Sequence, residues 1–154
     1  MTKNPAPTLD PRVIDPPHYT SGAVETIEVT RHLPFDLGNA YKYIARAGHK
    51  PGTPAVQDYA KARWYLRDHI EHFGPHVWLD LAVDAPLRRA VYAERDLLRR
   101  EALVQLLFGD IPRMQEAVQD LIDREDEPAA STAPAPLFAL PGFSGLTDLD
   151  EVTA

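Results

Sequence analysis

The sequence predicts a mainly α fold: a small helical domain with a Pro-rich N-terminal arm, an added C-terminal helical pair and a flexible acidic tail. Two observations carry this prediction. Apolar residues recur at helical spacing in several stretches between residues 35 and 125, and glycine or proline separates these stretches. At 154 residues the chain has the length of one ordinary domain with appendages. We expect an extended arm over 1–15, a core domain over 16–72, a helical extension over 77–125 and a tail over 126–154.

The composition narrows the class of protein. Hydrophobic residues make up 44% of the chain, which suffices for a modest core, and there is no cysteine for a disulfide framework or thiolate chemistry. No apolar run approaches the length of a membrane span, and the N-terminus lacks the apolar region of a signal peptide. We therefore expect no membrane partner and a cytoplasmic location. A net charge of −7 does not favour a nucleic-acid partner, although a local basic patch keeps one open.

The first 17 residues contain five prolines, which prevent regular structure. This arm is expected either to be disordered or to lie across a neighbouring subunit. His18 and Tyr19 follow two of these prolines, which bias the backbone toward extended conformations. The pair is a candidate ligand contact; the alternatives are a histidine that caps a helix and one that is merely exposed.

Residues 24–33 have an ambiguous pattern. Alternating apolar residues suit a strand, but Ser21 as a cap and Glu25 in a first turn favour a helix. Glu25 and Glu28 then lie at i and i+3 on one face. They are expected to bind a metal, to pair with the cations described next, or to be solvated.

The central stretch, residues 35–66, begins with a helical pattern over 39–47. Helical spacing places Asn39, Lys42, Tyr43 and Arg46 on one face. Gly48 is expected to end this helix because glycine readily adopts the left-handed conformation found just past a C-terminus. Lys50 follows in the loop.

A second helical pattern starts after Pro54, with Asp58, Lys61 and Tyr65 at i, i+3 and i+7. Two helices joined by a short loop usually pack as an antiparallel pair, so Lys42, Arg46, Lys50 and Lys61 are expected to converge. Converging cations suit phosphate, and Tyr43, Trp64 or Tyr65 can stack on a base. The alternatives are a solvated charged face and aromatic residues that belong to the core. Residues 31–69 hold seven Lys and Arg against three Asp, a local charge of +4 that favours an anion site.

Beyond the central stretch, residues 77–83 form a short apolar run, and one long amphipathic helix is predicted over 87–108. Gly109 is expected to end it, and a further helix is predicted over 111–124. His69, His72 and His76 do not predict a zinc site, because Gly74 and Pro75 separate the third from the others and no Cys or carboxylate supports them. Residues 120–154 carry a net charge of −7, with apolar residues that are expected to dock on the same chain or on a partner.

No familiar phosphate-binding loop of the GxxxxGK[ST] or GxGxxG type is present. Four blocks nevertheless carry a family resemblance: PPHY at 16–19, Ile27-Glu28, LGNAYKYIARAGHK at 37–50 and DYAKARWYL at 58–66. In this order they resemble the SaV-like domain of unknown function found in tailed phages. One member group of that family is a nucleotide kinase that phosphorylates deoxynucleoside monophosphates.

The resemblance covers about residues 16–72 and implies roles for residues within them. It implies that Lys42, Arg46 and Lys50 bind phosphates and that His18 and Tyr19 close over the ligand. Asp58 and Lys61 are implied to pair with one another or to complete the site, and Glu28 or Asp58 to orient or deprotonate the acceptor phosphate. The implied phosphate donor is a nucleoside triphosphate, with the need for Mg²⁺ left open, and the implied location is the host cytoplasm if a phage encodes the chain.

Three functions follow as alternatives. The first is a phage-type nucleotide kinase, in which catalysis is mostly positioning and charge stabilisation. The second is a protein that binds or sequesters nucleotides without turnover, and the third is an adaptor for nucleic acid or protein. An all-helical pyrophosphohydrolase ranks last, since Glu25 and Glu28 lack a matching downstream acidic pair. Because the 16–72 core is small, a homo-oligomer with a shared nucleotide site is also expected.

Overall fold

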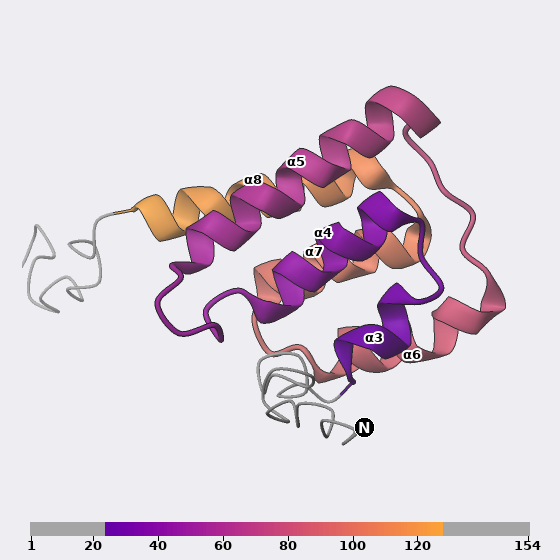
Figure 1. Ribbon diagram of the computed structural model, residues 1–154, viewed down its shortest axis with the longest axis horizontal. Coiled ribbons are helices and arrows are strands. Elements are labelled where there is room, and N and C mark those ends of the chain that lie inside the picture. Colours follow the sequence, from indigo (N-terminus) through magenta and orange to yellow (C-terminus); the bar gives the residue numbers. More distant parts are fainter. Residues whose placement is uncertain (1–23, 128–154) are drawn as a thin grey trace, which may run out of the picture.

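The computed structural model describes residues 24–127, and within them the regular structure is α-helical apart from one isolated β-bridge (Figure 1). The predicted mainly α class is confirmed. The Pro-rich arm, His18, Tyr19 and residues 128–154 of the acidic tail lie outside the described residues. The six helices are α3 (Thr26–Thr30), α4 (Phe35–Arg46), α5 (Ala55–Phe73), α6 (Leu81–Ala93), α7 (Leu97–Phe108) and α8 (Ile111–Asp126).

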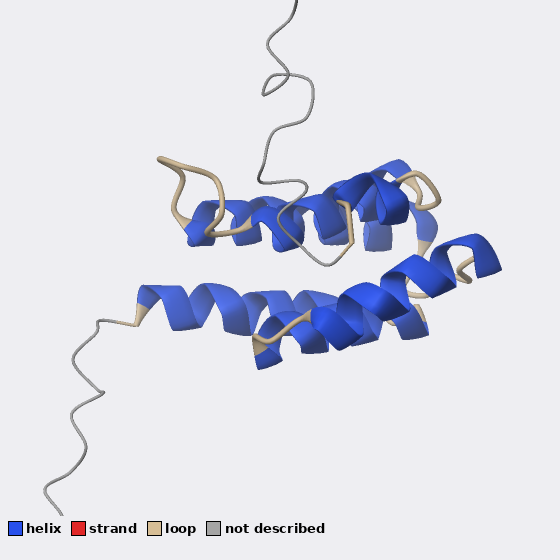
Figure 2. Cartoon of the chain, turned by 90° about the horizontal axis from the view of Figure 1, so that it is seen from below, coloured by secondary structure: helices blue, strands red, loops and turns tan. Residues whose placement is uncertain are grey.

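The helices form two layers, which Figure 2 shows edge-on. Helices α3, α4 and α5 make one layer and α6, α7 and α8 the other, so each half of the described chain supplies a layer (Figure 1). Contacts join α3 to α6 at one side and α5 to α8 at the other. The central helices α4 and α7 are therefore each flanked by two neighbours of their own layer.

Helix α3 confirms the helical alternative for residues 24–33, although it is only five residues long. Glu25 is its N-cap and Glu28 its N3 residue, and the two form a reciprocal capping box. Glu25 therefore has a capping role, while the expected cap Ser21 lies outside the described residues.

Helices α4 and α5 form the predicted antiparallel pair (Figure 1). Helix α4 begins at Phe35, four residues earlier than the expected start, with Pro34 as its N-cap. It ends as predicted before Gly48, whose φ of 78° is a left-handed conformation. Helix α5 starts directly after Pro54 and stops before Gly74.

The single long helix predicted over 87–108 is wrong. The chain forms α6 and α7 there, so the C-terminal layer has three helices rather than the predicted pair. The break lies at Glu94–Asp96, where Asp96 caps α7 by accepting hydrogen bonds from the amides of Leu98 and Arg99. The guanidinium of Arg100 binds the carbonyl of Glu94, which satisfies an acceptor at the end of α6.

Asp96 has a second role as an ion-pair partner of Arg124 on α8, at 2.9 Å. Burial acts to raise the pKa of Asp96, but the hydrogen bonds from the Arg99 amide and the Arg124 guanidinium outweigh it and lower that pKa below its ordinary value. The cap of α7 is thus also a link between α7 and α8.

The connection from α5 to α6 is fixed by backbone pairing with the α7–α8 turn. The amide of Val77 donates to the carbonyl of Gly109, and the amide of Ile111 donates to the carbonyl of Pro75. Gly109, at φ 71°, ends α7 as predicted. A Cβ atom at this position would overlap the carbonyl oxygen of Val77, so the close approach itself requires glycine.

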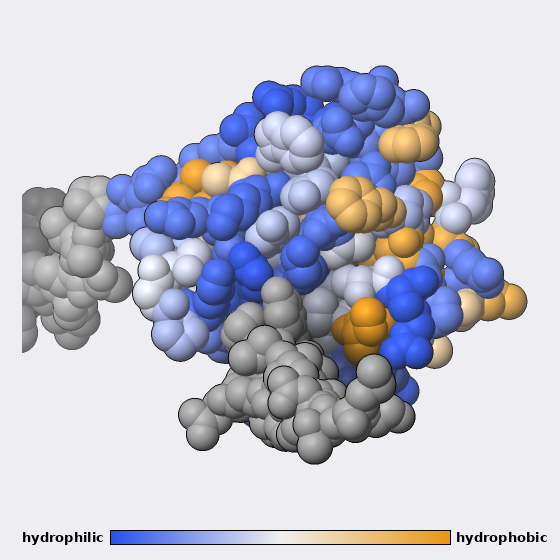
Figure 3. All heavy atoms as spheres, viewed as in Figure 1, coloured by the Kyte–Doolittle hydropathy of each residue, from blue (hydrophilic) through white to orange (hydrophobic). Residues whose placement is uncertain are grey.

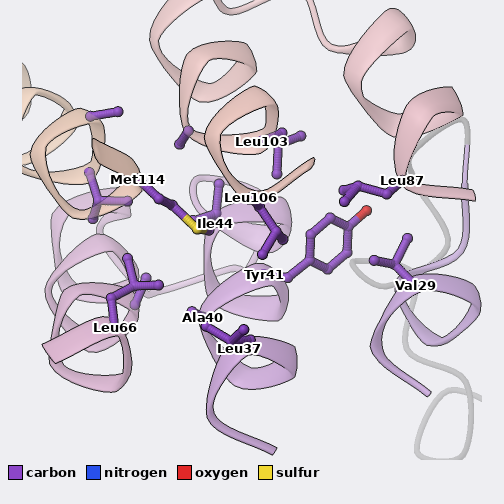
Figure 4. Packing of buried hydrophobic residues seen from close by; sticks show 14 of the residues in the cluster. Val29, Leu37, Ala40, Tyr41, Ile44, Leu66, Leu87, Leu103, Leu106 and Met114 are labelled. Atoms are coloured by element: carbon purple, nitrogen blue, oxygen red, sulfur yellow. The ribbon is translucent and has the colours of Figure 1, made fainter. Parts of the chain in front are cut away.

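One hydrophobic core lies between the layers and draws on all six helices. Figure 4 shows Leu106 of α7 beside Ile44 and Tyr41 of α4, with the ring of Tyr41 pointing toward Leu87 of α6. The boundary between a 16–72 domain and a 77–125 extension stays a prediction, but in the described residues both segments supply the same core. Between residues 24 and 127, no helix is both long enough and apolar enough to cross a membrane.

The outer surface is mixed, with apolar residues gathered at one end of the face shown in Figure 3. At the end of α5 and the start of α6, Phe73, Trp78 and Leu81 are 72%, 98% and 86% exposed.

A candidate anion site on helices α4 and α5

The centre of the candidate site is a buried ion pair between α4 and α5. Arg46 donates from Nε and Nη2 to the two carboxylate oxygens of Asp58, at 3.1 and 3.0 Å. Asp58 is 1% exposed and Arg46 7% exposed. The planar fork of Arg46 matches the carboxylate, which fixes the register of the two helices. Lys61, one turn further along α5, lies 3.6 Å from the same carboxylate.

Three cations surround the ring of Tyr43. The Lys42 Nζ and the Arg46 guanidinium carbon each lie 4.6 Å from the ring centroid, and the Lys61 Nζ lies 5.6 Å from it. A ring face attracts a cation because of its negative quadrupole. Two of these cations come from α4 and one from α5, so the antiparallel packing brings together residues that the sequence separates.

Lys42 is held by its own helix. Its ammonium donates to Asn39 Oδ1 at 2.6 Å, and Asn39 Nδ2 donates to the carbonyl of Phe35 at 2.7 Å. These contacts orient the head of Lys42 near a shallow pocket lined by Phe35, Asn39 and Lys42. The predicted shared face of Asn39, Lys42, Tyr43 and Arg46 is present in the structure.

Aromatic rings continue the site along α5. Tyr43 and Tyr65 stack at 5.9 Å, and Trp64 and Phe35 meet Tyr65 edge-on at 5.0 and 6.1 Å. Trp64 is 51% exposed and Phe35 79% exposed. Exposed rings beside cations form a surface that can stack on a flat ligand. Sequence reasoning missed Phe35, because the expected helix began four residues after it.

Glu28 has a different environment. Its Oε2 accepts from Arg89 Nη2 on α6 at 2.5 Å, and its other oxygen caps α3. It lines a pocket together with Arg31, His32 and Arg89. These contacts tie α3 to α6, so the structure gives Glu28 no contact with the cations around Tyr43. Its role as a catalytic carboxylate stays a prediction.

Lys50 lies half-buried in the loop between α4 and α5, and in the described part of the chain its ammonium has no ion pair. His18 and Tyr19, the remaining predicted contacts, lie outside residues 24–127. Their closure over a ligand stays a prediction.

A second buried pair was not predicted. His69 Nδ1 and Asp36 Oδ2 lie 2.6 Å apart, with both side chains buried between α4 and α5. His72 instead pairs with Asp68, and His76 takes part in the β-bridge with Asp110. No periodicity links residues 33 positions apart, so only the fold reveals the first pair. Among residues 24–127 no group of three His, Asp or Glu side chains is arranged to hold a metal ion.

The charge balance of the site favours an anion. Among the described residues, Lys42, Arg46 and Lys61 lie around one ring, and Asp58 is the carboxylate that contacts Arg46 and Lys61. Like charges this close repel one another, and a bound anion relieves that repulsion. An ammonium pair beside a fixed guanidinium suits a phosphate, and the neighbouring rings suit an aromatic group attached to it.

A protein family model, described as a protein of unknown function (DUF3310), matches residues 13–67. The described part of this match contains α3, α4 and most of α5, and thus every residue of the site described above. No curated protein and no solved structure matches the chain.

Proposed function

We propose that this protein is a nucleotide kinase-like protein, which transfers a phosphoryl group from a nucleoside triphosphate to a deoxynucleoside monophosphate. It binds nucleotides at the Tyr43 cluster, which consists of Tyr43 and the three cations around its ring, Lys42, Arg46 and Lys61. The observation that carries the proposal is the convergence of Lys42, Arg46 and Lys61 on one ring beside exposed aromatic side chains. The resemblance of residues 16–72 to the phage SaV-like family, which includes such a kinase, supports the choice of reaction.

In this proposal the cations have unequal tasks. Arg46 is buried with Asp58 and acts as the fixed support of the site. The Lys61 side chain is 45% exposed, and Lys42 lies at the surface pocket of α4, so their ammonium groups contact the phosphates. The rings of Trp64, Tyr65 and Phe35 accept the base. Phosphoryl transfer asks chiefly for this combination of positioning and charge stabilisation.

Asp58 is not needed as a base in this reaction. The second pKa of a phosphate monoester is about 6, so the acceptor phosphate is already largely a dianion at neutral pH. Both oxygens of Asp58 accept hydrogen bonds from Arg46, which suits a structural carboxylate better than a proton acceptor. The same observation favours a second candidate function, nucleotide binding without turnover.

The test is a nucleotide panel. Purified protein is mixed with each deoxynucleoside monophosphate and a triphosphate donor, with and without Mg²⁺, and the products are separated by chromatography while thermal unfolding is followed on the same samples. Formation of a diphosphate supports the kinase. Thermal stabilisation without product supports the binding protein. If there is neither product nor stabilisation, and the protein binds DNA with a strong dependence on salt, the site belongs to a nucleic-acid adaptor.

Variants assign the signal to the site. Lys42→Gln and Lys61→Gln each remove one ammonium group and should weaken nucleotide binding about tenfold, the effect of losing one charge-assisted hydrogen bond. Arg63→Gln is the matched control, because Arg63 is exposed on α5 and makes no ion pair in the described residues. Equal affinities for all three variants would refute the site. Sedimentation with and without nucleotide tests the predicted homo-oligomer.

A further inference from the structure

A second pocket lies on the opposite side of α4 from the Tyr43 cluster. It has a volume of about 450 Å³, within the roughly 300–1,000 Å³ of small-molecule sites. It opens between α4, the end of α6 and the start of α7, and its wall includes residues from both layers. Tyr41, Ile44 and Ala45 of α4 face it, whereas the helical period turns Lys42, Tyr43 and Arg46 away from it.

Arg99 is a fixed cation in this wall. Its Nε donates to the hydroxyl of Tyr59 at 2.7 Å, and the same nitrogen lies 3.9 Å from Asp96. The side chain is 16% exposed. Its Nη2 lies 3.8 Å from the place where Gly48 would carry a Cβ, so the guanidinium lies against the loop that follows α4. Because Tyr59 is fully buried in the core, it holds the guanidinium in one orientation.

The remaining charges of the pocket leave it cationic. Arg95 is exposed, and among residues 24–127 its guanidinium has no ion pair or hydrogen bond. His49 is also exposed at the rim. Glu94 is the acidic residue of the wall, and its Oε1 accepts the amide of Asp96. Arg95 and Arg99 therefore line the pocket together with one carboxylate, Glu94, which already accepts a hydrogen bond. Arg99 also pairs with Asp96, so of these two it is the guanidinium of Arg95 that has no ion-pair partner among residues 24–127.

The inner part of the pocket is apolar and aromatic. Val24, Ile44 and Leu103 line it beside the buried ring of Tyr41. Burial raises the pKa of Tyr41 to about 12, with Glu94 and Glu28 adding to the effect. Its hydroxyl is thus protonated at neutral pH and is a hydrogen-bond donor. An apolar floor with guanidinium groups at the rim suits a ligand with a flat apolar body and an anionic end.

We infer that this pocket is a binding site for an organic phosphate monoester of nucleotide size, whose phosphate contacts Arg95 and Arg99 and whose ring system lies against Tyr41 and Leu103. The site is independent of the proposed function, because its residues differ from those of the Tyr43 cluster. Helix α4 separates the two, and a helix with its side chains is about 10 Å across, so a phosphate in this pocket is out of reach of direct transfer at the cluster.

The test is a titration of the full chain labelled with ¹⁵N, followed by amide chemical shifts in NMR spectra. Deoxyadenosine monophosphate is the probe, with deoxyadenosine and inorganic phosphate as its two halves. The probe should shift the amides of residues 94–99 and of His49. Each half should bind at least about tenfold more weakly, since each lacks either the charged contacts or the apolar ones.

Variants separate this pocket from the cluster. Arg95→Gln should weaken binding at residues 94–99 about tenfold or more, while the matched control Arg88→Gln, on α6 outside the pocket, leaves it unchanged. Lys61→Gln should leave this site unaffected even if it weakens binding at the cluster. The absence of shifts at residues 94–99, equal binding of deoxyadenosine, or an unchanged affinity in Arg95→Gln would each overturn the inference.

Discussion

The buried pair of Arg46 and Asp58 makes a quantitative prediction about stability. Arg46→Gln removes the guanidinium and leaves a carboxylate that is 1% exposed. Breaking a buried pair from one side costs about 3–5 kcal/mol, because the remaining charge is left in the interior. Lys61 still lies 3.6 Å from that carboxylate, which places the expected cost near the lower end, at about 3 kcal/mol.

Urea unfolding followed by circular dichroism measures this cost. With a slope of about 1.5 kcal/mol per molar urea, the midpoint should fall by about 2 M. Arg63→Gln, an equal change at an exposed position of the same helix pair, should cost less than about 0.5 kcal/mol. The slope should stay constant, since the variant changes stability and not the surface exposed on unfolding.

The double variant Arg46→Met with Asp58→Leu provides the second half of the test. Replacing both members of a buried pair by apolar residues of similar size is often neutral, so the double variant should be more stable than Arg46→Gln alone. A cost for Arg46→Gln no larger than that of Arg63→Gln would refute the reasoning. It would mean that the guanidinium is hydrated in solution and free to act on a ligand.

Three further predictions concern the fold. Gly109→Ala should lower the melting temperature far more than Gly52→Ala. Both glycines have φ near 70°, but only a Cβ at Gly109 would overlap another backbone segment, so equal effects would contradict this. Leu106→Ala should cost about 2–5 kcal/mol in urea unfolding, whereas Leu97→Ala, 73% exposed on the same helix, should cost under 1 kcal/mol. Because the pKa of Asp96 is lowered in the folded state, its contribution to stability is present above about pH 4 and is lost as the pH falls through the folded-state pKa. Asp96→Asn should therefore reduce the loss of unfolding free energy between neutral and acidic pH. An unchanged dependence of the unfolding free energy on pH would show that other groups cause the loss.

Local sequence patterns determined the helical class and most helix ends. Pro54, Gly48 and Gly109 act through their own backbone preferences, which operate whatever surrounds them. The shared face of Lys42, Tyr43 and Arg46 also follows from the helical period alone. These features were predictable because each depends on residues within about one turn of the chain.

The break between α6 and α7 was not predictable from periodicity. Residues 94–96 are charged, but the apolar residues before and after them keep helical spacing, so the sequence pattern shows no break. Only the contacts of this segment show that the chain turns there: Arg100 binds the carbonyl of Glu94, and Arg124 pairs with Asp96. The two-layer arrangement has the same origin, since it depends on which apolar faces meet. A sequence pattern defines such a face but not its partner.

The sequence alone determined that cations and aromatic residues gather on two neighbouring helices. Tertiary structure decided which partner each charged residue has. Arg46 is buried against Asp58, and Lys42 and Lys61 flank the ring of Tyr43. Glu28 pairs with Arg89 instead. The reason is that the period of a helix tells which side chains share a face, whereas burial and pairing depend on atoms contributed by distant segments.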